Sequence, residues 1–251
     1  MKLFEKILFF ISVPRCVYCG EKLELDDRAL CKKCKEIYED KKERNCSICS
    51  KPLYSCDCTS KYLDSHFVHK LIKVYRYKAG EKSPNNELIY RLKRENRRDT
   101  VNFLAEELSS AIKRCLTPDE NTIITYVPRR KRAIIKYGID HSKALAKAIS
   151  KNLSVEYKPL LTSKAKHAQK KSENTEQRIE NAKFKLKNDK LSLKAKTVIL
   201  VDDIVTTGAS MGAAAFNIKT LTPKRIVGAT IAVAYKDFYL PPSSEDRFYK
   251  K

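Results

Sequence analysis

Apolar residues along this chain follow two spacings, one typical of strands and one typical of helices. Short apolar-rich runs predict strands at Phe67–Tyr77, Thr122–Val127, Thr197–Val201 and Ile226–Ala234. Apolar or small residues at helical spacing predict helices at Glu87–Arg97, Asp99–Leu116, His141–Lys151 and Ala209–Lys219. Strands that alternate with helices predict an α/β fold with a parallel, doubly wound sheet, in which ligands bind at the carboxyl ends of the strands.

Polar segments separate these elements and predict irregular structure. We expect a linker at Lys61–Ser65, a turn at Ala79–Asn86, a mobile loop with short elements at residues 162–190, and a frayed tail from Pro241. The apolar start, Leu3–Val13, is about half as long as a membrane-spanning helix needs. We expect a helix packed on the protein, with a membrane-surface anchor as the alternative. No cleavage site of small residues follows it, so we expect a cytoplasmic protein.

The run VILVDDIVTTGAS at Val198–Ser210 carries the most specific chemistry in the chain. An apolar strand runs into two adjacent carboxylates, and a Thr-Thr-Gly turn then opens a helix. Backbone N–H groups at a helix start hold phosphate, glycine allows close approach, and carboxylates accept hydrogen bonds from ribose hydroxyls. The candidate ligand-binding residues are Asp202, Asp203, Thr206, Thr207, Gly208, Ala209 and Ser210, and the two aspartates are also the candidate catalytic residues.

This run resembles the phosphoribosyl-pyrophosphate (PRPP) motif of type I phosphoribosyltransferases at every position of the pattern. An ordinary strand–turn–helix is the alternative, but it explains only Thr206 and Gly208 and gives no reason for two adjacent acids. A P-loop does not fit, because no lysine follows the glycine. The resemblance implies a type I phosphoribosyltransferase-like sheet that binds PRPP together with Mg²⁺.

The chain is strongly basic, and the charge is uneven. Its 251 residues hold 52 Lys+Arg and 30 Asp+Glu, a net charge of +22. Residues 121–200, directly before the PRPP-like motif, hold 20 Lys/Arg and six acids. Such an excess favours phosphates, nucleic acid or an anionic membrane face, with a solvated lysine-rich surface as the alternative.

Eight of the nine cysteines fall in pairs near the start of the chain. They are Cys16, Cys19, Cys31, Cys34, Cys46, Cys49, Cys56 and Cys58. Paired cysteines in a cytoplasmic protein indicate structural zinc rather than disulfides or free core thiols. One or two ions fit the spacing, with the pairs used consecutively or interleaved. We therefore expect an N-terminal helix and zinc-binding head at residues 1–60 and a phosphoribosyltransferase-like domain at residues 61–251.

A head of paired cysteines before a C-terminal PRPP motif resembles the ComF (competence protein F) family over nearly the whole chain. Val127-Pro128 and the basic run after it resemble that family's loop after the first sheet strand. The family usually continues with Arg-Gly-Phe-Asn and then Gln or His, whereas this chain has Tyr137 and Asp140 in place of the Arg and the Asn. Lys136 and Arg132 are candidates for the lost cation. A later block, Gln169, Arg178, Asn181 and Phe184, also resembles the family.

The resemblance implies a role in DNA uptake during natural transformation, with single-stranded DNA and helicase-like or recombination proteins as partners. Two functions follow. In the first, the protein is an enzyme that transfers a phosphoribosyl group. Arg129–Arg132 and Lys136 then stabilise the leaving pyrophosphate, and Lys164–Arg178 closes over the site. In the second, it is a non-catalytic nucleic-acid-binding adaptor that keeps the PRPP fold. The phosphoribosyl acceptor is not identified by any visible motif.

Overall fold

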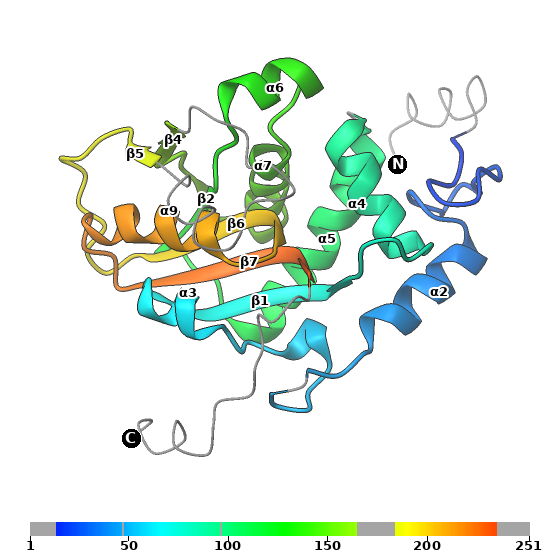
Figure 1. Cartoon of the computed structure of the whole chain (residues 1–251), viewed down its shortest axis with the longest axis horizontal. Coiled ribbons are helices and arrows are strands. Elements are labelled where there is room, and N and C mark those ends of the chain that lie inside the picture. Colours follow the sequence, from blue (N-terminus) through cyan, green and yellow to red (C-terminus); the bar gives the residue numbers. More distant parts are fainter. Residues whose placement is uncertain (1–13, 47, 96, 165–183, 235–251) are drawn as a thin grey trace.

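A five-stranded, fully parallel sheet forms the centre of the molecule in the computed structural model, which describes residues 14–46, 48–95, 97–164 and 184–234 (Figure 1). Its strands are β1 (Val68–Tyr77), β2 (Thr122–Tyr126), β3 (Glu156–Tyr157), β6 (Thr197–Val205) and β7 (Arg225–Ala234). Their order is β1-β7-β6-β2-β3, and every pairing between neighbours is parallel. The predicted parallel α/β sheet is therefore confirmed.

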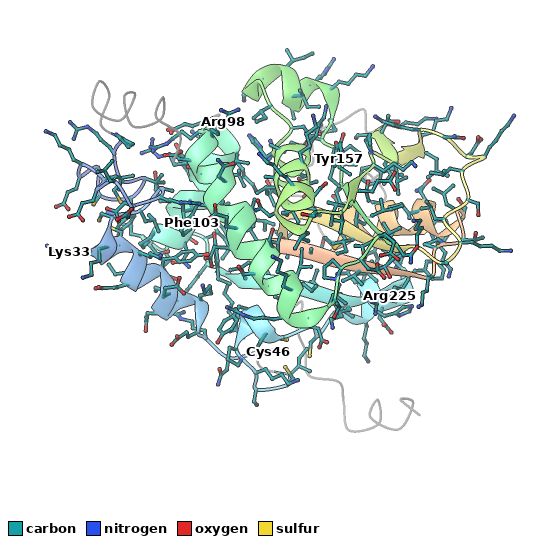
Figure 2. The ribbon with its side chains drawn as sticks, turned by 180° about the vertical axis from the view of Figure 1, so that it is seen from behind. Lys33, Cys46, Arg98, Phe103, Tyr157 and Arg225 are labelled. Atoms are coloured by element: carbon teal, nitrogen blue, oxygen red, sulfur yellow. The ribbon has the colours of Figure 1, made fainter. Side chains whose placement is uncertain are left out.

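Helices cover both faces of this sheet. One face packs against α5 (Arg98–Cys115) and α7 (His141–Leu153), which lie in front of the sheet in Figure 2. The other packs against α3 (Lys61–Ser65) and α9 (Ala209–Lys219), on the near side in Figure 1. Alternate residues of β6 serve the two faces, because Ile199 joins the α5–α7 core and Leu200 joins the α9 core. This alternation is what makes the sheet doubly wound.

Shorter elements surround the sheet. Helix α2 (Lys32–Lys42) packs against α4 (Pro84–Arg94), and the 3₁₀ helix η1 (Leu53–Ser55) contacts β1. Helix α6 (Lys131–Tyr137) follows β2. A separate antiparallel pair joins β4 (Leu161–Ser163) to β5 (Phe184–Leu186). No helix among the described residues is long and apolar enough to cross a membrane.

Several local predictions are wrong. Lys61–Ser65 is a helix rather than a linker, because Ser60 caps its N-terminus and Leu63 is fully buried. Helix α4 begins at Pro84, inside the predicted turn, because Ser83 caps it and proline suits its first turn. Strand β6 continues past Val201, because Asp202 and Ile204 still pair with β7. Helix α6 and strand β3 have no predicted counterpart.

Some predictions concern parts of the chain outside the described residues. These are the helix at Leu3–Val13, most of the proposed closing segment Lys164–Arg178, the family-like Gln169, Arg178 and Asn181, and the tail from Pro241.

The cysteine-rich start of the chain packs directly on the sheet. Cys16, Cys31 and Cys34 belong to the same buried cluster as Phe103 of α5. Further along, the backbone N–H of Leu71 in β1 donates to the carbonyl of Asp57 at 3.0 Å. Because β1 is an edge strand, this contact covers part of an otherwise open sheet edge.

Candidate functional site

The turn between β6 and α9 forms a small pocket at the carboxyl end of the sheet. The pocket is lined by Asp202 and residues 204–211. Gly208 has a φ of 79°, a left-handed conformation that glycine adopts without strain, and it directly precedes α9. The backbone N–H of Ala209 donates to the Thr207 hydroxyl at 3.3 Å. The pocket thus joins backbone N–H groups at a helix start with hydroxyls and one carboxylate.

The two aspartates of β6 have different surroundings. Asp203 is only 6% exposed, and its Oδ2 lies 3.3 Å from Nη2 of Arg129 and 3.6 Å from Nζ of Lys93. Its Oδ1 accepts the N–H of Ile204 at 2.7 Å. Burial alone would raise the pKa of Asp203, but the charges of Lys93 and Arg129 outweigh it and lower that pKa. Asp203 is therefore a buried, ion-paired carboxylate.

Asp202 is the aspartate that lines the pocket. Its Oδ1 accepts the Ser142 hydroxyl at 3.0 Å and the backbone N–H of Asp203 at 2.9 Å. Burial and the neighbouring charge of Asp203 raise the pKa of Asp202. The side chain is partly exposed, so it can meet a ligand directly.

The start of α7 holds Arg129 in place. Asp140 caps this helix, because its Oδ1 accepts the N–H of Lys143, while its Oδ2 accepts the backbone N–H of Arg129, each at 3.2 Å. His141 is fully buried, and neither ring nitrogen has a protein partner. Burial, and then the charge of Arg129, lower the pKa of His141 to about 4. The ring is therefore neutral at pH 7.

The structure brings together only some of the predicted ligand-binding residues. Arg129 pairs with Asp203, which directly follows the pocket-lining Asp202, whereas Arg132 and Lys136 are exposed on α6. Sequence reasoning missed Lys93 and Ser142, which come from α4 and α7 and carry no motif. Asp140 stood out as a departure from the family pattern, and that departure marks the residue that caps α7.

Comparison with known protein families gives evidence that is independent of this geometry. Residues 140–251 match the family described as the phosphoribosyl transferase domain. The matched segment begins at the cap of α7 and contains β6, the turn and α9. The C-terminal part of the chain is therefore similar to phosphoribosyl transferase domains. The resemblance to the ComF family stays a prediction.

Solved structures with partial similarity include three phosphoribosyltransferases. A hypoxanthine phosphoribosyltransferase from Staphylococcus aureus is 12% identical, with 55% of this chain and 73% of that chain covered and a TM-score of 0.34. A purine phosphoribosyltransferase from Pyrococcus horikoshii is 19% identical (56% and 77% covered, TM-score 0.35). An adenine phosphoribosyltransferase from Leishmania tarentolae is 12% identical (57% and 74%, TM-score 0.33). Comparison with curated proteins finds no match.

The eight paired cysteines gather into two groups of four, in consecutive order along the chain. In each group the four sulfur atoms lie within 4.8 Å of one another. The first cysteine group is Cys16, Cys19, Cys31 and Cys34, and the second cysteine group is Cys46, Cys49, Cys56 and Cys58. Four sulfurs at this separation suit a tetrahedral metal ion, so each group could hold one.

In each group one thiol has a lowered pKa, which favours its thiolate form. Burial would raise the pKa of Cys16, but N–H donors of Cys19, Cys31 and Tyr18 lower it to about 7. The pKa of Cys46 is also lowered, because N–H donors of Cys49 and Ile48 and the charge of Lys73 oppose its burial. Thiolates are the form that binds metal.

Proposed function

We propose that this protein binds PRPP, complexed with Mg²⁺, at the β6–α9 turn. The observation that carries the proposal is the pocket in which the start of α9 faces the Asp202 carboxylate. The match of residues 140–251 to the phosphoribosyl transferase domain supports the same conclusion. The pocket offers donors for a phosphate and an acceptor for hydroxyls, the two features of a phosphorylated ribose.

Each side of the pocket has a separate task in this proposal. The 5-phosphate accepts hydrogen bonds from the backbone N–H groups of residues 207–210 and from the hydroxyls of Thr206, Thr207 and Ser210. The ribose hydroxyls donate to Asp202, which Ser142 orients by its 3.0 Å hydrogen bond. Mg²⁺ offsets the charge of the pyrophosphate group when PRPP is bound.

Asp203 acts on Arg129 rather than on the ligand. Because it is buried and paired with Arg129 and Lys93, it holds two cations beside the pocket. As the bond from C1 of the ribose to pyrophosphate breaks, negative charge accumulates on the leaving group, and a fixed cation lowers the energy of that state. We propose a phosphoribosyl transfer that releases pyrophosphate.

Calorimetric titration with Mg²⁺-PRPP tests the binding site. Asp202→Asn should weaken binding by about tenfold, or about 1.4 kcal/mol, because the amide replaces one accepting oxygen with an NH₂ group that cannot accept from the ribose hydroxyls. Asp189→Asn, at an exposed turn, is the matched control and should bind as the wild type does. Unchanged affinity in a folded Asp202→Asn variant would remove Asp202 from the site. Pyrophosphate release with candidate acceptors then separates turnover from binding alone.

We also propose that each cysteine group holds one structural zinc ion. The sulfur separations and the fourfold cysteine composition support it. With four protein ligands per ion, no coordination position is open, so the metal stabilises the fold and takes no part in catalysis. Elemental analysis of the purified protein should find two equivalents of zinc, and a metal-free preparation with an ordered head would refute the proposal.

Single-stranded DNA is a second candidate ligand. The observation that favours it is α6, which exposes three cationic side chains, Lys131, Arg132 and Lys136, beside an 82% exposed Ile135. The net charge of +22 supports the same partner class. In this proposal the protein handles incoming strands during DNA uptake, as the ComF resemblance implies, either as a transferase or as an adaptor without turnover.

Fluorescence anisotropy over a series of salt concentrations tests DNA binding. Replacing Lys131, Arg132 and Lys136 together by Ala should flatten the log–log salt dependence by about two units, since each phosphate neutralised on a single strand contributes about 0.7. Replacing the exposed Lys187, Lys190 and Lys194 by Ala is the charge-matched control. Equal slopes in both triple variants would remove α6 from the interface.

A further inference from the structure

A second cavity lies at the amino ends of three neighbouring strands, β2, β6 and β7. Its volume is about 120 Å³, whereas a single water needs about 10–15 Å³ of such space, so an ion of several heavy atoms fits. The chain between α5 and β2 lines one part of it, and the starts of β6 and β7 line the rest. Because a strand rises about 3.3 Å per residue, Thr197 at this end of β6 lies about 16 Å from Asp202 in the pocket at the β6–α9 turn.

The first residues of the three strands lie side by side at this cavity. Thr122 of β2 pairs with Thr197 of β6, and Thr197 pairs with Arg225 of β7, which is labelled in Figure 2. The backbone N–H of Thr197 donates to the carbonyl of Asn121 at 2.9 Å, and Nε of Arg225 donates to the Thr197 hydroxyl oxygen at 3.2 Å. Groups on paired strands are held more precisely than groups on loops, so the cavity presents its polar atoms in a fixed arrangement.

Two cations at the cavity have no acidic partner within the part of the chain that the structure describes. The ammonium of Lys224 makes no hydrogen bond or ion pair there, and the guanidinium of Arg225 makes only the bond from Nε. Both Nη groups of Arg225 therefore remain for a ligand. The guanidinium fork and the lysine ammonium are the usual side-chain donors to phosphate oxygens, so this pair of side chains suits an oxyanion.

One carboxylate, that of Asp119, also lines the cavity. Its Oδ1 accepts the N–H of Asn121 at 3.1 Å and the Thr122 hydroxyl at 3.0 Å, whereas its Oδ2 accepts no hydrogen bond from the described residues. A carboxylate repels an anion unless the anion brings a proton that the carboxylate can accept. At neutral pH inorganic phosphate keeps at least one P–OH group, and sulfate has none. Asp119 therefore favours phosphate over sulfate.

We propose that this cavity binds inorganic phosphate. Lys224 and the Nη groups of Arg225 donate to the phosphate oxygens, and the P–OH group donates to Oδ2 of Asp119. The cavity lies at the opposite end of β6 from the proposed PRPP pocket, so the two sites can be filled separately. The proposal depends neither on PRPP binding nor on the proposed zinc ions.

Amide NMR of the full-length protein tests this proposal, because it reports the two ends of β6 separately. Sodium phosphate replaces sodium chloride at constant ionic strength and constant pH 7, and sodium sulfate is titrated in the same way. Phosphate should shift the amide signals of Thr122, Thr197 and Arg225 in a saturable manner. Sulfate should bind at least about tenfold more weakly, because it has no proton for Asp119. The amide signals of residues 207–210 report the pocket at the β6–α9 turn.

Three variants assign the roles of single side chains. Lys224→Gln removes one exposed cation and should weaken phosphate binding at least about fivefold. Lys82→Gln, at an exposed lysine between β1 and α4, is the matched control and should bind phosphate as the wild type does. Asp119→Asn keeps an oxygen for Asn121 and Thr122 but replaces the other by an NH₂ group, which donates instead of accepting. It should reduce the preference for phosphate over sulfate to less than about threefold.

The outcomes distinguish this inference from the proposed PRPP site. Without phosphate shifts at the starts of β2, β6 and β7, the inference is overturned. Shifts confined to residues 207–210 overturn it as well, and they place phosphate in the proposed PRPP pocket. Equal binding of phosphate and sulfate by the wild type, or unchanged phosphate binding by Lys224→Gln, also overturns it. Shifts at the strand starts that weaken in Lys224→Gln support it, whether or not the protein binds PRPP.

Discussion

The second cysteine group and the parallel sheet beside it rely on different sources of stability. Around the second group, the buried apolar cluster among the described residues consists of Cys46, Leu53 and Cys56. The sheet buries apolar side chains on both faces, such as Ile199 on one and Leu200 on the other. A segment with so small a core needs another source of folding energy, whereas packing suffices for the sheet. Metal removal should therefore separate the two regions.

Chelation gives the largest effect expected from this difference. Apparent binding energies of structural zinc are about 10 kcal/mol or more, so removing the metal should unfold the chain around Cys46–Cys58. Limited trypsin digestion should then cleave rapidly after Arg44, whose carbonyl accepts the N–H of Leu53 in the folded segment, and leave the peptides of β6 and β7 protected. The control is the same chelator already saturated with zinc. If the Arg44–Asn45 bond stays protected from trypsin in the metal-free protein, the two regions do not differ in their source of stability.

A substitution that creates a cavity beside the sheet should have the opposite effect, because it should destabilise the sheet and leave the metal content unchanged. Leu200 is fully buried in the central strand β6, so Leu200→Ala should lower the free energy of unfolding by about 2–5 kcal/mol. The zinc content should stay at the wild-type value, because the cysteine groups lie elsewhere. Urea unfolding measures the first quantity and elemental analysis the second. Leu25→Ala, at a 47% exposed position, is the control and should change stability by less than about 0.5 kcal/mol.

The pH dependence of the free energy of unfolding gives a further test of the sheet region. The unfolded chain protonates His141 near pH 6.5, whereas the folded protein holds its pKa at about 4. Unfolding therefore takes up a proton between these values, and the free energy of unfolding falls as the pH is lowered from 6.5 toward 4. The loss is about 2–3 kcal/mol.

Urea unfolding at pH 7 and pH 4.5 measures the contribution of this ring. His141→Asn should remove most of the difference between the two pH values. His69→Asn, at an exposed histidine paired with Asp64, should retain it. A variant without His141 that keeps the full wild-type pH dependence would assign that dependence to other groups.

The smallest expected effect lies within the ligand pocket. Ser142→Ala removes the hydroxyl that orients Asp202, so PRPP binding should weaken about fivefold, or about 1 kcal/mol. Ser150→Ala, in the same helix, also loses one hydrogen bond, from its hydroxyl to the Val155 carbonyl. It should lower stability but leave PRPP affinity unchanged. Calorimetric titration of both variants separates orientation of Asp202 from general loosening of α7.

The sequence predicts the helices and strands correctly where buried apolar residues recur at a regular spacing. Helix α9 spans Ala209–Lys219 as predicted, and the four predicted strands are all present. The strand at Thr197–Val201 continues to Val205, because backbone pairing with β7 does not depend on side-chain polarity. The polar side chains of Asp202 and Asp203 led us to predict that the strand ends at Val201, although its backbone pairing continues. Helix α3 was missed because a capping serine and one buried leucine were enough to form it.

For the candidate site, the sequence predicts only the residues that are consecutive in the chain. The β6–α9 turn has a recognisable order of residues, and Arg129 stands in a basic run. Lys93 reaches Asp203 from α4, more than a hundred positions earlier in the chain, and such a contact depends on the tertiary fold. The burial of Lys73 is equally invisible in the sequence, where its strand alternates basic and apolar residues.

The covered edge of β1 has a consequence for handling this protein. The carbonyl of Asp57, between Cys56 and Cys58, accepts the N–H of Leu71. If loss of metal releases this segment, the edge strand exposes unpaired backbone groups, which can pair with another chain. Chelating buffers during purification should therefore promote aggregation that zinc suppresses, even when the β6–α9 turn and its pocket remain folded.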